Sequence, residues 1–303
     1  MRVNDASARA RAWTTRPERS NRPVLRFIVW VALTLGRRAA RVLLYPACGY
    51  FQLTSGGANA ASAHYLRRVL AREPSWRDTF RHYHTFAATI LDRVFLFNDK
   101  YSRFDVRVHG ETVMADLAAR GGGCFLLGAH MGSFEIVRAL GRKYPNVRVS
   151  LVMYEENARK FNSVLRAINP SVALQVIPLG NADSMLKVDA ALVRGDFVGI
   201  LADRTIQDEG TVVRDFLGAP ARFPLGPFRL AAMLKRPIVL MFGLYRGKNR
   251  YDIHFERLVD MREIPRERRH DAIEQAVTSY VSRLEHYCRI APFNWYNFYD
   301  FWH

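Results

Sequence analysis

Short apolar segments alternate with amphipathic segments along most of this chain, and this alternation is what most limits the folds open to it. Strand-like segments are expected at residues 104–108, 124–129, 147–153, 174–177, 197–202, 212–216, 238–245 and 251–257. Helical patterns fall at residues 58–72, 75–98, 111–120, 133–143, 156–167, 182–194, 226–235 and 267–289. Such alternation predicts an α/β fold in which a mostly parallel sheet is covered by helices on both faces. The functional residues of such folds gather at the carboxyl ends of the strands.

The size of the chain agrees with one large domain that carries an N-terminal appendage. With 303 residues, of which 49% are hydrophobic, the chain can bury a sizeable core. We expect a basic mobile lead (1–23), a membrane-associating helical segment (24–53) and a main domain (54–303), which comprises a helical part (54–100), an α/β core (101–290) and an aromatic tail (291–303). The three cysteines are far apart in the sequence, which indicates a reducing compartment.

The segment 24–53 contains two apolar runs, Val24–Gly36 and Val42–Leu53, on either side of an arginine cluster. A helix of about a dozen apolar residues spans roughly 18 Å, short of the roughly 30 Å hydrocarbon core of a bilayer. The pattern favours a helix that lies in the membrane interface, with its arginines at anionic headgroups and Trp30 and Tyr45 at the boundary. The arginines of the cluster are Arg37, Arg38 and Arg41. An ordinary core helix is the alternative.

The chain is strongly basic, with a net charge of +17, and residues 1–41 alone carry ten arginines against two acidic residues. A charge of this size predicts an anionic partner, which could be a membrane surface, an acidic carrier protein or a nucleic acid. Nucleic acid is disfavoured because no basic stripe is interleaved with aromatic residues. A basic membrane- or nucleic-acid-binding protein without catalysis therefore remains the alternative to an enzyme.

The strongest chemical signal is His130, which follows the apolar predicted strand 124–129. Gly132 permits a tight turn there, and Ser133 can cap the next helix, which carries Glu135 in its first turn. An imidazole of near-neutral pKa can remove a proton from a hydroxyl, and a carboxylate on its other nitrogen fixes its tautomer. The N–H groups at the helix start could bind an oxyanion. The structural alternative is a lone histidine beside a helix-capping glutamate.

Other catalytic classes lack their motifs. No Gly-x-Ser-x-Gly nucleophile elbow occurs, the glycines before His130 are not followed by the lysine of a phosphate-binding loop, and no Gly-x-Gly-x-x-Gly is present. His82 and His84 are two positions apart on a predicted helix, where side chains diverge, and His-Glu-x-x-His is absent. We therefore expect no metal and no separate cofactor.

The His-x4-Glu spacing of His130 and Glu135 resembles the signature of the lysophospholipid acyltransferase superfamily. The wider sequence is similar to the lipid A secondary acyltransferase branch of that superfamily, whose members also begin with a membrane-seeking segment. A strand ending in Ala-Asp, here Gly199–Arg204, is shared with that branch. So is the stretch Phe-Leu-Gly-x-Pro-Ala followed by Pro-x-Gly, here residues 216–226. The resemblance covers roughly residues 20–300.

The resemblance implies that residues 54–303 form an acyltransferase domain. Its reaction would pass an acyl group from an acyl carrier protein or CoA thioester to a hydroxyl of a membrane lipid or lipid precursor. The expected place is the cytoplasmic face of the inner membrane. By the resemblance His130 is the general base and Glu135 its orienting partner. The implied substrate-binding residues are Asp203, Arg204, Arg222, Arg229 and Gly226.

The chain departs from the lipid A branch at two places, which leaves the acceptor open. Arg204 stands where the branch usually has Gln, and seven of the thirteen residues of the tail 291–303 are aromatic. The tail resembles the acyltransferases encoded with aryl polyene pigment pathways, while a lipid A acyltransferase proper is the alternative. The aromatic residues either seal the end of the sheet or line an acyl tunnel. Nothing in the pattern bears on oligomeric state.

Overall fold

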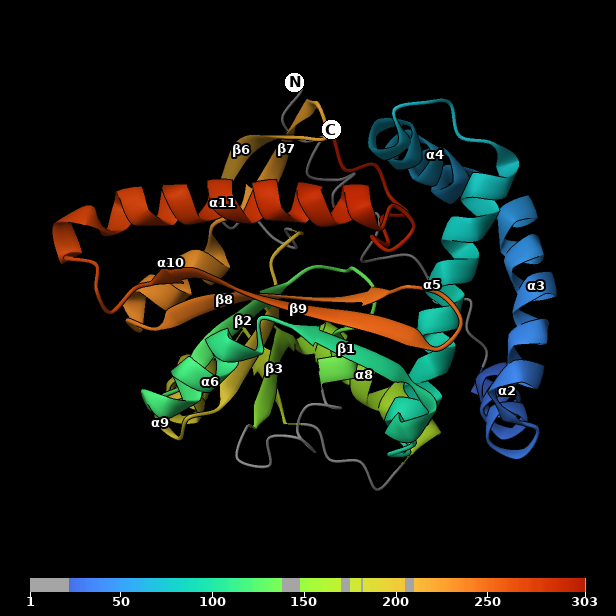
Figure 1. Cartoon of the computed structure of the whole chain (residues 1–303), viewed down its shortest axis with the longest axis horizontal. Coiled ribbons are helices and arrows are strands. Elements are labelled where there is room, and N and C mark those ends of the chain that lie inside the picture. The colour runs from blue at the N-terminus through green and yellow to red at the C-terminus, as the bar shows by residue number, and fades with distance from the viewer. Residues whose placement is uncertain (1–21, 138–147, 170–174, 181, 205–209, 303) are drawn as a thin grey trace.

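The apolar segments of the sequence form a seven-stranded sheet in the order β1-β9-β8-β2-β5-β3-β4 (Figure 1). All pairs in this sheet are parallel except β8 with β9. The strands are β1 (Asp105–His109), β2 (Cys124–Gly128), β3 (Val149–Tyr154), β4 (Val176–Leu179), β5 (Phe197–Leu201), β6 (Thr211–Phe216), β7 (Ala219–Pro224), β8 (Pro237–Tyr245) and β9 (Arg250–Asp260). This computed structural model describes residues 22–137, 148–169, 175–180, 182–204 and 210–302.

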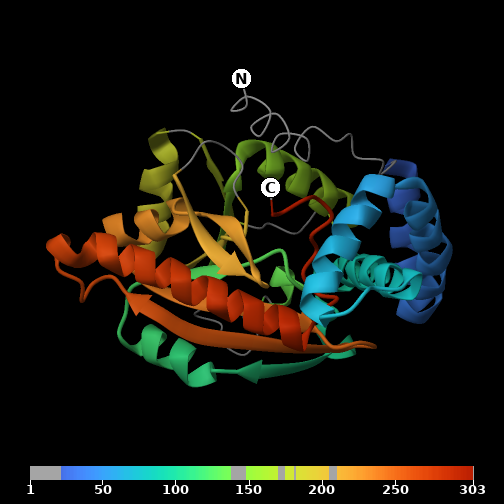
Figure 2. The same ribbon diagram turned by 90° about the horizontal axis from the view of Figure 1, so that it is seen from above.

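Helices cover both faces of the sheet, so its central strands are buried on both sides (Figure 2). Along β2, Phe125 and Leu127 pack with α9, α10 and α11, whereas Cys124 and Leu126 pack with α5, α6 and α8. The helices are α2 (Arg22–Thr34), α3 (Gly36–Thr54), α4 (Gly56–Leu70), α5 (Trp76–Leu96), α6 (Glu111–Ala119), α8 (Glu155–Ile168), α9 (Ala182–Val193), α10 (Gly226–Met233) and α11 (Arg269–Ile290), with 3-10 turns η2 (Tyr101–Arg103), η3 (Phe134–Val137) and η4 (Arg266–Arg268). The predicted fold class is confirmed.

Two local expectations differ from the structure. Where a helix was expected at 133–143, the described part is the 3-10 helix η3, and residues 138–143 lie outside the described residues. The strand β7 was not predicted because its two prolines disguise the strand pattern, yet it pairs antiparallel with β6. The turn between them uses Leu217 and Gly218, both at positive φ, as a tight hairpin requires.

The N-terminal helices α2 and α3 lie against the outer side of α5 (Figure 1). Arg37 forms two hydrogen bonds with the buried carboxylate of Asp92, at 2.6 and 2.7 Å, and Arg41 donates to the carbonyl of Lys248. The expectation that the whole arginine cluster faces headgroups is therefore wrong for these two residues, because their charges hold α3 to the core.

Among the described residues, every helix is too short or too polar to span a bilayer. Of the expected lead 1–23, residues 1–21 lie outside the described residues.

The C-terminal tail crosses the edge of the sheet where β2 ends and is bonded to the segment that follows this strand. Met131 and Trp295 form an isolated antiparallel bridge, and the N–H of Tyr296 donates to the carbonyl of His130 at 2.8 Å. Within the tail Trp295 is fully buried, and the indole of Trp302 donates to the carbonyl of Phe216. These contacts agree with an aromatic tail that seals the end of the sheet.

Gly132 provides a test of the turn that follows β2. Its φ is +57°, and a Cβ there would lie 1.9 Å from the carbonyl oxygen of Gly243. Gly132→Ala should therefore cost about 2–4 kcal/mol of unfolding free energy and lower activity, because the backbone must shift two residues from His130. Gly247→Ala is the matched control, since φ is +97° but no atom lies within 4 Å, and should cost about 1 kcal/mol. Equal losses for both variants in urea titrations would contradict this account.

Candidate active site

The register of the parallel strands brings His130 beside Asp203. β2 and β5 pair with Gly128 opposite Leu201. Two residues after these positions, the backbone reaches His130 beyond β2 and Asp203 beyond β5. The ring Nδ1 of His130 lies 2.9 Å from Oδ1 of Asp203, and the backbone N–H of His130 donates to Oδ2 at 3.1 Å. Two neighbouring strand ends therefore produce one histidine–aspartate pair at the carboxyl edge of the sheet.

The carboxylate of Asp203 is completely buried and has one further donor and a nearby cation. The indole N–H of Trp295 donates to Oδ2 at 2.9 Å, and Nε of Arg204 lies 3.7 Å from the same oxygen. Burial alone would raise the pKa of Asp203, but His130, Arg204 and the Trp295 hydrogen bond outweigh it and hold the pKa well below its ordinary value. Asp203 is therefore ionised and acts as a hydrogen-bond acceptor.

The surroundings of His130 favour its neutral form. Its pKa is lowered from the ordinary value of 6.5 by burial and by the cations of Arg204 and Arg93, which together outweigh the opposite effect of Asp203. The imidazole is therefore neutral at neutral pH. Because an ionised carboxylate only accepts hydrogen bonds, Nδ1 carries the proton and Nε2 has the free lone pair. This is the protonation state that a general base needs.

Glu135 has different partners from those expected. The predicted contact with the His130 ring is replaced by an ion pair between its Oε1 and Nε of Arg93, at 2.9 Å, while its Oε2 accepts from the hydroxyl of Ser133 at 3.0 Å. The reason is that η3 packs against α5, which carries Arg93, whereas the neighbouring strand β5 places Asp203 at the His130 ring. Glu135 nevertheless lies in the wall of the same cavity as His130.

The first N–H groups after the turn are not available for an oxyanion. The N–H of Gly132 donates to the carbonyl of Asn294, and that of Ser133 donates to the carbonyl of Gly243, both at 2.8 Å. These two N–H groups therefore do not bind an oxyanion, and an oxyanion site at the N–H groups of η3 stays a prediction. The side chains of Arg93 and Arg204 supply positive charge at the cavity instead.

A hollow of two adjoining cavities opens beside His130. The part next to the histidine has a volume of about 420 Å³, a size typical of ligand pockets. Its walls combine His130, Arg93, Glu135 and Arg204 with apolar side chains from Phe134, Leu151, Val152, Met153, Phe161, Leu179, Ile200 and Leu201. Because most of this wall is apolar and its few charged groups converge near the histidine, the cavity can hold a hydrocarbon chain with a reactive polar end.

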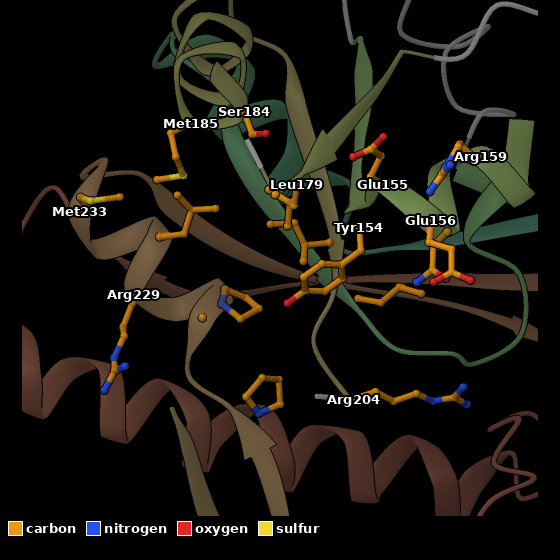
Figure 3. A pocket seen from close by; sticks show the side chains of 18 residues that line it. Tyr154, Glu155, Glu156, Arg159, Leu179, Ser184, Met185, Arg204, Arg229 and Met233 are labelled. Atoms are coloured by element: carbon orange, nitrogen blue, oxygen red, sulfur yellow. The ribbon is translucent and has the colours of Figure 1, made fainter. Parts of the chain in front are cut away.

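A second cavity of about 760 Å³ adjoins the first and shares Tyr154, Leu179 and Arg204 with it. Figure 3 shows Tyr154 between the methionines of one side, Met185 and Met233, and the charged residues of the other. Those charged residues are Glu155, Glu156 and Arg159, and Arg229 lies at the lower left of the view. This part of the hollow is more polar than the part beside His130.

The structure brings together most of the residues that the sequence analysis selected, with one exception. Arg204 lies between the two cavities, and Arg229 and Gly226 line the larger one. Arg222 lies on β7 with an exposed side chain and lines neither cavity. Within the described tail, residues 291–302 also line neither cavity, so the aromatic residues there form no part of the described tunnel wall.

Two residues of the site were missed. Arg93 was read as part of an amphipathic helix, and Trp295 as one of many aromatic residues in the tail. Arg93 lines the cavity, and Trp295 donates to Asp203. The available signals were a basic residue in the last turn of α5 and an indole N–H that needs an acceptor when buried. Neither signal identifies the partner.

One group in the described part of the chain has the composition of a metal site. His109 and His254 face each other on β1 and β9, and their possible ligand atoms and those of Asp252 all lie within 4.8 Å of one another. Both carboxylate oxygens of Asp252 accept from Arg250, and Arg246 is 3.2 Å away. The paired cations oppose metal binding here, and none of the three possible ligands lines the cavities beside His130.

Comparison with known proteins identifies the class and the family. The family model described as bacterial lipid A biosynthesis acyltransferase matches residues 72–302. The protein is therefore an acyltransferase of lipid biosynthesis, which decides against a basic binding protein without catalysis. More particularly, the chain belongs to the bacterial lipid A biosynthesis acyltransferase family.

The other two comparisons add little. None of the curated proteins matches the chain. Among solved structures, the 1-acyl-sn-glycerophosphate acyltransferase PlsC from Thermotoga maritima is similar, with a TM-score of 0.38 and 14% identity. The similarity covers 82% of this chain and 98% of that one.

The lowered pKa of His130 has a measurable consequence. For a reaction that uses His130 as its base, activity should be retained while pH falls through 6.5 and should be lost only as the pH passes the lower pKa of the folded protein. Measurement of kcat/KM between pH 5 and 8 should therefore place the acid limb below pH 6.5. An acid limb above that value would contradict the assigned environment of the imidazole.

Proposed function

We propose that the protein transfers an acyl group from the thioester of an acyl carrier protein or CoA to a hydroxyl of a lipid or lipid precursor, with His130 as general base. The observation that carries this proposal is the imidazole of His130, bonded through Nδ1 to Asp203, in the wall of a mostly apolar cavity. Nε2 takes the hydroxyl proton while the oxygen attacks the thioester carbonyl. As the C–S bond breaks, the imidazolium returns that proton to the departing thiolate. No metal or separate cofactor is needed for these steps.

The cavity supports this assignment of substrates. Its apolar walls suit an acyl chain, because burial of each CH2 contributes about 0.8 kcal/mol. Arg93 and Arg204 lie on the same wall as His130, where their charges can stabilise the oxyanion that forms on the thioester carbonyl. The adjoining cavity, with Arg229 and Gly226, is proposed to take the acceptor or the phosphopantetheine arm of the donor. Asp203 is buried, and Arg222 is exposed but lines neither cavity, so neither is included as a substrate contact.

Glu135 is proposed to act through Arg93 rather than through His130. Its carboxylate holds the guanidinium at the edge of the cavity and is itself held by the hydroxyl of Ser133. The His-x4-Glu motif would thus supply a base and, five residues later, the anchor of a cation. His130 and Glu135 both line the cavity in which the reaction is proposed to occur.

The proposed acceptor is a lipid of the kind that the family modifies or a related lipid. Family membership favours a lipid A precursor, whereas the aromatic tail resembles the acyltransferases of aryl polyene pathways. The net charge of +17 favours an acidic carrier protein as the donor, because opposite charge speeds encounter. The two acceptors differ in their headgroups and can be separated by mass.

We place the enzyme at the cytoplasmic face of the inner membrane, held by α2 and α3. These helices expose large apolar side chains to solvent, among them Trp30 (56% exposed), Tyr45 (57%), Val42 (65%) and Leu53 (88%). Val42, Tyr45 and Leu53 lie on one stripe of α3, opposite the buried Ala40, Leu44 and Cys48. Aromatic and aliphatic side chains on one helix face, with Arg38 exposed among them, are typical of interfacial helices.

Vesicle binding tests this placement. Trp30→Ser with Tyr45→Ser should weaken binding to vesicles of phosphatidylglycerol and phosphatidylethanolamine on the order of tenfold or more, because two apolar side chains no longer enter the bilayer. The matched control is Leu186→Ser with Val193→Ser, two exposed apolar residues on α9. Equal binding of both double variants in a sedimentation assay would remove the support for a docking face on α2 and α3.

Lipid mass spectrometry tests the reaction itself. Cells that carry a deletion or the His130→Ala variant should lose the same acylated lipid, whose mass identifies the acceptor and the acyl chain. With purified enzyme the variant should be about 10²–10⁴-fold slower while remaining folded. His270→Ala, at an exposed histidine of α11, is the control and should leave the lipids unchanged. An unchanged lipid profile in the deletion strain would rule out a lipid acceptor.

A further inference from the structure

We propose that Asp203, clamped by the indole of Trp295, is the residue that positions His130, and that the C-terminal tail is therefore part of the catalytic machinery. This inference rests on the proposed function, because it concerns the orientation of the proposed base. It gives the role of orienting carboxylate to a residue 73 positions beyond His130 instead of to Glu135 of the local motif.

Asp203 contacts His130 at two points, which fixes the ring relative to its own backbone. Oδ1 lies 2.9 Å from Nδ1 of the ring, and Oδ2 accepts the backbone N–H of the same residue at 3.1 Å. A carboxylate bound at both points holds the imidazole in one rotamer and one tautomer. Nε2 is thereby turned away from Asp203 and remains the ring nitrogen without a proton.

Trp295 holds the carboxylate in turn. Its indole N–H donates to Oδ2 of Asp203 at 2.9 Å, a charge-assisted hydrogen bond in a fully buried place. The backbone of Trp295 is fixed as well, because its carbonyl accepts from Nε2 of the buried His82 at 2.8 Å. The next residue, Tyr296, donates its N–H to the carbonyl of His130 and accepts from Arg204. The tail therefore surrounds the histidine–aspartate pair with bonds from both backbone and side chain.

Glu135 is already committed elsewhere. Each of its two oxygens has a partner, Arg93 on Oε1 and the hydroxyl of Ser133 on Oε2. To reach His130 it would have to leave Arg93 unpaired at the cavity wall, which is costly for a mostly buried cation. Asp203, by contrast, needs no rearrangement.

The first test reads the tautomer of His130 directly in the unmodified protein. Long-range ¹H–¹⁵N NMR of the full chain, with the His130 signals assigned by their loss in His130→Gln, should show a neutral ring protonated at Nδ1. A ring protonated at Nε2 would overturn the proposal. This measurement needs no acyl transfer, so it separates the inference from the proposed function.

The second test compares two isosteric variants by their pH profiles. The charged groups around the ring are Asp203 and Arg204 beyond β5, Arg93 of α5 and Glu135 of η3. Asp203→Asn should lower kcat about 10²–10⁴-fold with little change in KM, and should move the acid limb to lower pH because an anion that favours the imidazolium is removed. Glu135→Gln should leave the acid limb in place. A shifted limb in Glu135→Gln with an unchanged one in Asp203→Asn would return the positioning role to Glu135 and overturn the proposal.

The third test uses a pair of tryptophans from the same tail. Trp295→Phe removes the N–H that holds Asp203, and kcat should fall on the order of tenfold with KM nearly unchanged. Trp302→Phe removes an indole bond of similar length to the carbonyl of Phe216, and should leave kcat within about twofold at a comparable loss of stability. Thermal unfolding of both variants provides the stability reference. Equal loss of kcat in the two variants would mean that the tail acts only on stability and would overturn its catalytic part.

The outcomes separate cleanly. Full activity of His130→Ala together with an Nδ1-protonated ring would end the proposed function and leave the geometry of the pair intact. Normal activity of a folded Asp203→Asn would end the inference and leave the proposed function intact. If Asp203→Asn does not fold, the tautomer and the Trp295 pair still decide.

Discussion

The buried carboxylate of Asp203 is the constraint on which the rest of the site depends. An ionised group without solvent must be paired or its burial costs several kcal/mol, so the surrounding fold has to supply donors. His130 at the end of β2 and Trp295 in the tail supply hydrogen-bond donors, and Arg204 beside Asp203 itself supplies a cation. These segments are far apart in the sequence and meet only because β2 and β5 are neighbours and the tail crosses their ends.

The same pairing rule explains how a chain of net charge +17 can fold around so many arginines. Arg37 binds the buried Asp92, Arg93 binds Glu135, and Arg283 binds Glu256, so several guanidiniums are paired with carboxylates of the fold. The planar guanidinium suits such paired contacts better than the ammonium of lysine. The excess that remains at the surface is what a negatively charged partner would meet. Each such pair removes one positive and one negative charge together, so the net excess of +17 remains after the pairing.

The hollow beside His130 divides the site into two environments. The part next to the histidine is walled mostly by apolar residues of the strands, and the adjoining part carries Arg229 and the charged start of α8. Arg204 lies on the boundary and lines both. A reaction between an acyl chain and a polar acceptor needs such a division, because each partner must be desolvated by surroundings of its own kind.

The sequence by itself determined the fold class, the order of nearly all helices and strands and the placement of His130 and Asp203 at strand ends, because apolar periodicity and strand termination are local properties. Only the tertiary structure decided which carboxylate meets the imidazole. Five residues separate His130 from Glu135, yet η3 turns Glu135 toward Arg93, while strand order and register put Asp203 in contact with the ring. Trp295 likewise joins the site only through a tertiary contact, its hydrogen bond to Asp203. The strand β7 was not predicted because its two prolines are tolerated only in the hairpin that it forms with β6. Contacts between distant segments depend on which elements pack together, and a local pattern of residues does not contain that information.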